Sequence, residues 1–129
     1  HLADLENTRR RLQREREDIV RYGNESLLRE LLGTIDNLER TLLYIPVGSE
    51  NKNLRDGIEL VLKQFANTLQ QCGVKEISPQ GEAFDPHSHE AISQRSEAGK
   101  EAQTVLEVHQ KGYRYHDRLL RPARVTIAG

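Results

Sequence analysis

The sequence lacks Trp and Met altogether and is poor in aromatic residues and cysteine. Only 36% of its 129 residues are hydrophobic, whereas 30% are charged. A low content of apolar residues that are distributed along helices is typical of proteins whose helices bury one face against another chain. The single cysteine, Cys72, excludes an intramolecular disulfide and fits a reducing compartment, so we expect a cytoplasmic protein.

Long hydrophobic runs and a hydrophobic leader are also missing. No segment approaches the roughly 20 apolar residues that a membrane span requires, so the sequence predicts no membrane association. Because the chain begins with His1 and contains no Met, we expect a fragment or processed form without its natural N-terminal segment. The absence of a targeting signal therefore carries little weight.

The strongest pattern lies in residues 28–45. Apolar residues recur there at alternating spacings of three and four: Leu28, Leu31, Ile35, Leu38, Leu42 and Ile45. At about 3.6 residues per turn they form one stripe along a helix. Leu27, Leu32 and Leu43 widen this stripe, which favours a helix with more than one neighbour over a two-stranded coiled coil.

Residues 1–23 predict a weaker helical stripe. Leu5, Leu12 and Ile19 recur every seven residues, and no Pro or Gly interrupts the segment before Gly23. The alternate core positions are mostly polar or glycine, so a paired stalk of these helices should melt easily. The phase of the stripe changes at Gly23-Asn24, where we expect a change of packing partner; whether the helix continues through this pair is left open.

A second strong helix is predicted after a short loop at Pro46 and Gly48. It begins near Asn53 and stops at Gly73, which follows Cys72. One face of this helix carries Leu54, Ile58, Val61, Leu62, Phe65 and Leu69. The short connection favours an antiparallel hairpin with the central helix.

Two such helices have more apolar surface than they can cover themselves. A dimer would bring four helices together in a bundle, which we expect here. The alternative is a monomer whose C-terminal segment folds back over the hairpin. The predicted dimer contacts are Leu5, Leu12, Ile19, Leu28, Leu31, Ile35, Leu38, Leu42, Ile58 and Phe65.

After Gly73 the pattern becomes that of short strands. Val74–Ile77 is strand-like, and residues 104–108 and 124–127 alternate with period two. The predicted fold class is therefore α+β, with three parts. These are a long paired helix (1–23), a helical hairpin that forms a four-helix bundle across a dimer (24–72), and a small antiparallel β-domain (73–129).

The segment Asp85-Pro86-His87-Ser88-His89 raises the question of a metal site. Zinc normally takes three or four ligands, and no other His or Cys stands at motif spacing. His87 and His89 would also point to opposite sides of a strand. We therefore interpret the segment as a turn opened by Asp-Pro and predict neither metal nor cofactor.

Basic residues cluster near both ends of the chain. Residues 1–22 hold six basic and five acidic side chains, so a phosphate-tracking stripe is not expected there. The basic residues of 111–124 are better suited to docking another protein. No phosphate loop and no nucleophile motif with a plausible base is present, which argues against an enzyme.

Several sequence segments resemble the GrpE family. The match begins with Phe84-Asp85-Pro86, His89 and Ala91-Ile92, and continues with Gly112-Tyr113, Asp117, Leu120-Arg121, Ala123, Val125 and Ile127. Residues 6–11, 35–40 and 57–63 are also similar to that family. The resemblance covers essentially the whole chain.

The resemblance implies a function in which the protein itself makes and breaks no covalent bond. GrpE proteins are homodimeric nucleotide exchange factors of the chaperone DnaK, acting in protein folding and the heat-shock response. One protomer grips the nucleotide-binding domain, tilts one lobe outward and lets ADP leave. The competing interpretation is a coiled-coil adaptor that has no effect on nucleotide.

The resemblance also implies a DnaK-facing surface. Carried over by position, it includes Arg9, Arg10, Arg40, Gly57, His109, Arg118 and Ile127, with Phe84 and Pro86 shaping the β-domain. For Ile127, core packing is the alternative to contact. His109 and Asp18 depart from the family pattern, which often has an apolar residue at the first position and can have a basic residue at the second.

Overall fold

Two long helices precede six strands in the computed structural model, which describes all residues from His1 to Gly129. Helix α1 spans Leu2–Tyr44, a single 3-10 turn spans Ser49–Asn51, and α2 spans Lys52–Gln71. The strands are β1 (Val74–Ile77), β2 (His89–Arg95), β3 (Val105–Gln110), β4 (Gly112–Tyr115), β5 (Arg118–Arg121) and β6 (Ala123–Ala128). The predicted α+β class is confirmed.

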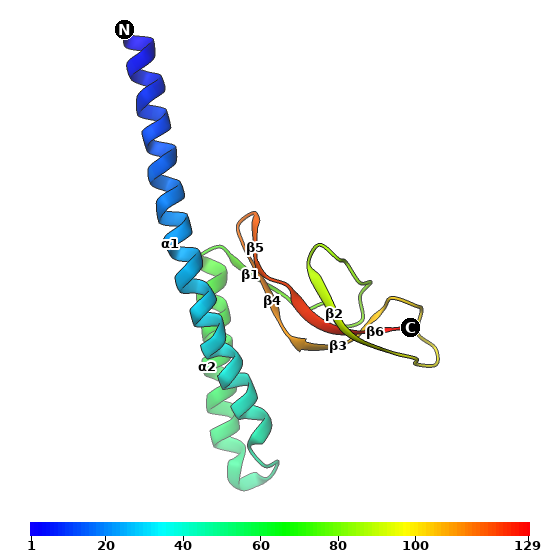
Figure 1. The fold of residues 1–129 in the computed structure, drawn as a ribbon. Coiled ribbons are helices and arrows are strands. Elements are labelled where there is room, and N and C mark those ends of the chain that lie inside the picture. Colours follow the sequence, from blue (N-terminus) through cyan, green and yellow to red (C-terminus); the bar gives the residue numbers. More distant parts are fainter.

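Helix α1 is continuous through Gly23-Asn24 and extends well beyond the rest of the chain (Figure 1). Up to Val20 every residue of α1 is exposed, and contacts with the strands begin at Tyr22. The Asn24 side chain donates a hydrogen bond to the Tyr115 hydroxyl at 3.4 Å. The strands thus contact α1 at Gly23-Asn24, the residue pair expected to weaken the helix most.

The two helices form the antiparallel hairpin that the short loop predicted (Figure 1). The Arg55 guanidinium donates hydrogen bonds to the carbonyls of Leu42 and Ile45, at 3.2 and 3.1 Å. The bond to Ile45 satisfies a carbonyl at the end of the helix, and the Leu42 carbonyl also accepts a bond from the Ile45 amide at 3.4 Å. At the other end, α2 stops as expected, because Gly73 adopts a left-handed φ of 92°.

The strands form two small sheets, with the orders β1-β4-β5 and β2-β6-β3. Pairing is antiparallel except between β2 and β6, which run parallel. The antiparallel arrangement predicted for this part therefore needs one correction. Three strands were not predicted: β2, β4 and β5. In β2 the residues after His89 are exposed and show no apolar alternation, and β4 and β5 are only four residues each.

Two apolar clusters hold the chain together. The larger one joins α1, α2 and the first sheet, and contains Leu32, Ile35, Leu69, Val74, Tyr113, Tyr115 and Leu120. The smaller one lies under the second sheet and contains Val105, Ala123, Val125 and Ile127. The C-terminal strands thus cover one face of the hairpin, as the monomeric alternative required, but leave other apolar side chains of the helices exposed.

Neither helix carries an apolar stretch long enough to cross a bilayer.

Candidate partner-binding surface

The segment before β2 is the turn that Asp-Pro predicted. The Asp85 side chain accepts a hydrogen bond from the His87 amide at 3.0 Å, and its carbonyl accepts one from the His89 amide at 2.8 Å. The His89 ring in turn accepts a bond from the Asp85 amide at 2.9 Å through Nδ1. His89 is buried beside Phe84, with ring centroids 5.8 Å apart. This histidine therefore shapes the turn, whereas His87 is exposed.

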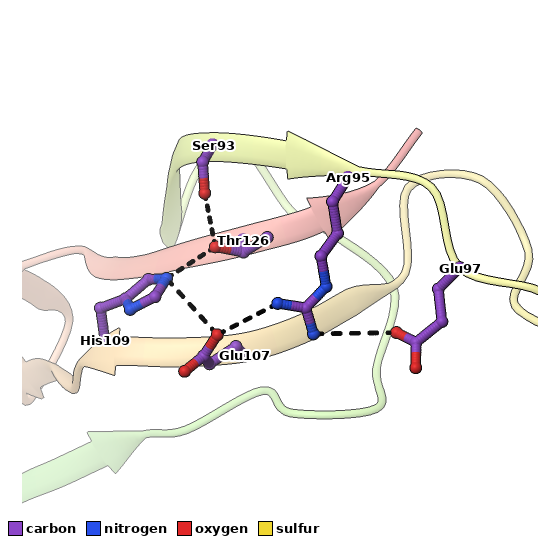
Figure 2. Close-up of polar contacts among 6 residues, drawn as sticks. All are labelled: Ser93, Arg95, Glu97, Glu107, His109 and Thr126. Carbon is purple, nitrogen blue, oxygen red and sulfur yellow. Dashed lines mark hydrogen bonds and ion pairs between the residues drawn. The ribbon is translucent and has the colours of Figure 1, made fainter.

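A row of polar side chains crosses the second sheet, as Figure 2 shows. The Thr126 hydroxyl on β6 lies 2.6 Å from the Ser93 hydroxyl on β2 and 2.6 Å from Nε2 of His109 on β3. A hydroxyl has one proton and two lone pairs, so Thr126 donates to at most one of these neighbours and can accept from both.

The row continues through ion pairs along the edge of β3. His109 Nε2 lies 4.0 Å from a Glu107 carboxylate oxygen, and Arg95 bridges Glu107 at 3.4 Å and Glu97 at 3.8 Å (Figure 2). The side chains of Arg95 and Glu107 are about half exposed. This face of the β2-β6-β3 sheet therefore presents fixed charges and hydrogen-bonding groups to solvent, and its opposite face is the smaller core.

Only His109 of this row was nominated from the sequence. Ser93, Glu107 and Thr126 were missed, although one signal was available for Thr126. It stands between Val125 and Ile127, and both apolar neighbours are buried in the smaller cluster. Period-two alternation thus places Thr126 on the opposite, polar face of β6.

The structure places Ile127 in the core, at 7% exposure. Its side chain packs with Val105 and Val125 under the second sheet. Of the two interpretations left open for this residue, core packing is the one observed. Phe84 packs partly buried against the same cluster, and Pro86 is exposed in the turn that follows it.

Arg118 is engaged within its own chain. Its guanidinium lies 4.3 Å from the centroid of the Tyr22 ring, donates a hydrogen bond to the Tyr22 hydroxyl at 2.8 Å and pairs with Glu25 at 3.3 Å. The bond to Tyr22, together with the Glu25 charge, raises the pKa of Arg118 above its ordinary value. Arg118 thus attaches β5 to α1, and its contact with a partner stays a prediction.

The remaining predicted contacts lie on the helices. Arg9 and Arg10 are exposed on the projecting part of α1, and Arg40 is exposed near its end. Gly57 of α2 has no atom within 4 Å of the position that a Cβ would occupy. It adjoins a shallow apolar groove of about 210 Å³, lined by Leu38, Leu54, Ile58 and Val61 among others. These positions are separate from the polar row on the second sheet.

The predicted dimer contacts fall into two groups. Leu5, Leu12 and Ile19 are 69%, 55% and 72% exposed, so a single chain leaves this stripe uncovered. Ile35 is instead buried in the larger cluster, and Leu28 and Phe65 pack against it. The others are half-buried: Leu31, Leu38, Leu42 and Ile58.

A charged cluster surrounds Lys111, which lies between β3 and β4. Lys111 contacts Glu39 of α1 at 3.2 Å and Glu76 of β1 at 3.1 Å. Burial disfavours the Lys111 ammonium, but the two carboxylates outweigh it and raise its pKa. Burial, and then the charges of Glu76 and Glu39, raise the pKa of Tyr113 to about 12. Both groups therefore keep their protons throughout the physiological range.

The fold is α+β: a long helical hairpin carries two small sheets on its side, and the outer sheet has an exposed polar face. The family model that matches the chain is GrpE, and it covers residues 1–129. The chain belongs to the GrpE family.

Known members of the family are similar along almost the whole chain. The protein named Protein GrpE from Nitratidesulfovibrio vulgaris is 43% identical over 127 residues, which are 98% of this chain and 66% of that relative. Protein GrpE from Legionella pneumophila is 42% identical over 127 residues, with 98% and 63% covered. Protein GrpE from Halalkalibacterium halodurans is 42% identical over 125 residues, with 97% and 64% covered. The chain thus spans slightly less than two thirds of the length of these relatives.

Proposed function

We propose that this chain acts as a nucleotide exchange factor of a DnaK-type chaperone in the cytoplasm. The observation that carries the proposal is the family match over all 129 residues. The polar row on the second sheet and the open approach to Gly57 supply exposed surface for the chaperone.

The proposed action is differential binding. The exchange factor binds the open, nucleotide-free arrangement of the DnaK nucleotide-binding domain more tightly than the closed arrangement that holds ADP. It can shift the equilibrium toward the open form only by this difference in affinity. Reciprocity then requires ADP to weaken the complex by the same factor. The factor itself makes and breaks no covalent bond, so the proposal needs neither catalytic residues nor a cofactor.

We also propose that the working form is a homodimer. The exposed stripe of Leu5, Leu12 and Ile19 repeats every seven residues, as the seam of a paired helix does. Regular exposed apolar surface of this kind marks an interface. Residues 1–23 would form the paired stalk, residues 24–72 half of a four-helix bundle, and residues 73–129 the chaperone-binding β-domain.

Sedimentation equilibrium tests the dimer. The wild type should sediment with twice the mass of one chain, and Leu12→Asp should lower the mass average, because it places a charge in the seam. A wild type that stays at the mass of one chain over the micromolar range would refute the dimer.

The release of fluorescent ADP from DnaK, with and without this protein, tests the proposed activity. Acceleration supports exchange, and an unchanged rate favours the alternative of an adaptor that binds without affecting nucleotide. The assay should be run over a range of concentrations of this protein. An adaptor that only binds DnaK would leave the ADP release rate unchanged even at saturating concentration.

Gly57→Asp locates the chaperone contact on α2. The open space around Gly57 lets the side chain fit without a clash, so the protein should fold. If DnaK approaches there closely, added bulk and charge should lower the stimulation of ADP release. Gly33→Asp is the matched control, because Gly33 is also an exposed helical glycine with no atom within 4 Å of its Cβ position. Equal stimulation by both variants would remove Gly57 from the proposed surface.

A further inference from the structure

Strand β5 lies along one face of α1 (Figure 1) and carries an arginine at each end. Glu25 and Asp36 of α1 are eleven positions apart, which is about three helical turns, so they point to the same side. Arg118 pairs with Glu25, and Arg121 pairs with Asp36. We call these four residues the arginine clamp. Leu120 lies between the two arginines and is buried in the larger core cluster.

The pair between Asp36 and Arg121 is the stronger end of the clamp. The two guanidinium nitrogens donate hydrogen bonds to the two carboxylate oxygens at 2.5 and 2.7 Å. This bidentate geometry fixes direction as well as distance. The side chains of Arg121 and Asp36 are only 18% and 16% exposed, so water screens the pair poorly.

Further bonds hold both partners of that pair in place. Gln110 donates a hydrogen bond to the Asp36 carboxylate at 3.0 Å. Nε of Arg121 donates to the Lys111 carbonyl at 2.9 Å, and the guanidinium lies 5.3 Å from the centroid of the Tyr113 ring. Lys111 and Tyr113 thus hold the Arg121 side chain in the orientation that reaches Asp36 of α1.

The other end of the clamp, Arg118 with Glu25, prevents the strands from rotating on α1. Arg118 contacts Glu25 and Tyr22, and the Arg29 side chain donates a hydrogen bond to the Leu120 carbonyl at 3.2 Å. A single attachment would let the strands pivot about it. Attachment at both ends of β5 removes that freedom.

The covalent link alone would not fix this arrangement. The chain passes from α2 into β1 through Cys72 and Gly73, and Gly73 has the φ of 92° that glycine tolerates best. The two sheets are thus joined to the helices by a short glycine-containing connection. Their orientation depends on the core cluster and on the clamp.

We propose that Asp36 and Arg121 are positioning residues, which hold the β-sheets at one angle on α1 so that helices and sheets engage the chaperone as a single rigid body. The inference rests on the proposed function, because it assigns the rigid body a role in exchange. The two residues need not touch the partner, since they act by fixing where the exposed face of the β2-β6-β3 sheet stands relative to the helices.

A distance measurement tests the positioning itself. Spin labels are placed at Ser26→Cys on α1 and Ala91→Cys on β2, both exposed, in a chain with Cys72→Ser. Labelled chains are diluted into an excess of unlabelled chains, so that only distances within one protomer are recorded. Electron-electron double resonance should give one narrow distance distribution for this chain.

Asp36→Asn should broaden or shift that distribution, because Asn has the same size but cannot form the bidentate ion pair. Arg121→Lys should do the same, since a lysine lacks the planar fork. Glu30→Gln is the control, because Glu30 is exposed on α1 and forms no hydrogen bond or ion pair through its side chain. Distributions for Asp36→Asn and Arg121→Lys as narrow as the control, at the same distance, would overturn the proposal.

The exchange assay tests the consequence. In full-length dimers, Asp36→Asn should lower the maximal rate of ADP release from DnaK by about tenfold, the order of loss expected when binding groups are misplaced. The concentration for half-maximal effect should change much less, because the contacting side chains are all still present. A broadened distance distribution with an unchanged maximal rate would refute the proposed role of this positioning in nucleotide exchange.

The two proposals fail in distinguishable ways. If the wild type does not accelerate ADP release, the proposed exchange function fails, and the distance measurement still decides whether Asp36 and Arg121 fix the angle. If the wild type is active and the variant distances are unchanged, only the positioning proposal fails.

Discussion

Replacing Leu32 by Ala should destabilise the chain more than most single substitutions. Leu32 is 0% exposed and lies where α1, α2 and the first sheet meet. Removing a fully buried leucine side chain costs the transfer free energy of the lost groups plus a term for the cavity. We expect a loss of about 3 kcal/mol in the free energy of unfolding. For a chain of this length, that corresponds to a fall of about 10 °C in the melting temperature.

Far-ultraviolet circular dichroism during heating measures this effect, with urea unfolding as a second probe. Leu43→Ala is the matched control. Leu43 stands eleven positions further along the same face of α1, beyond the reach of the strands, and is 84% exposed. It should change stability by less than about 0.5 kcal/mol. Equal losses for the two variants, or a loss below about 1 kcal/mol for Leu32→Ala, would show that the docking of the sheets on α1 is not as described.

Two further substitutions test the strands. The Tyr113 pKa is raised from 10.0 to about 12 in the folded chain, so the unfolded chain releases this proton first and stability should fall as pH rises from about 10 to 12. Tyr113→Phe should make that fall in stability less steep, as measured by urea midpoints from pH 9 to 11. Some fall should remain, because the raised pKa of Lys111 acts in the same direction. Parallel curves for the two proteins would contradict the raised pKa of Tyr113. Gly112→Ala should cost about 1–3 kcal/mol through overpacking, because its Cβ would stand 2.5 Å from the Ala123 backbone nitrogen. Gly33→Ala, with open space around it, should instead raise helix stability by up to about 1 kcal/mol, and a stable Gly112→Ala protein would mean that β4 and β6 approach less closely than described.

Local sequence patterns predicted the parts of the fold that local physics governs. The stripes in residues 1–23 and 28–45 together predicted helix α1. Gly73 predicted the end of α2, and the strand predicted at Val74–Ile77 has the bounds observed. Helical periodicity and turn chemistry depend on residues a few positions apart, so they are legible in one sequence. The Asp-Pro turn before β2 was likewise predicted from its own residues.

The same stripe did not reveal which neighbour each of its residues meets. Ile35 was predicted to face another chain, yet it is buried within its own chain by α2 and the strands. The identity of an apolar residue does not indicate which surface will cover it, because any apolar surface removes it from water equally well. The separate stripe of Leu5, Leu12 and Ile19, by contrast, is left uncovered by its own chain.

The candidate surface divides in the same way. The resemblance to the family pointed to His109 and Arg118 as contact residues. Only the structure shows that His109 and Ser93 both contact the Thr126 hydroxyl, and that Arg118 donates a hydrogen bond to Tyr22. These contacts join strands in a register that sequence alone does not give, including the parallel pairing of β2 with β6.

The sequence by itself therefore determined the helices, three of the six strands (β1, β3 and β6), the turn at Asp85 and the family. The tertiary structure alone decided that β5 lies along α1 between Glu25 and Asp36. Asp36 and Arg121 are 85 positions apart, and in the sequence each looks like an ordinary surface charge. Their pairing exists only because the core cluster around Leu32 brings strand and helix together.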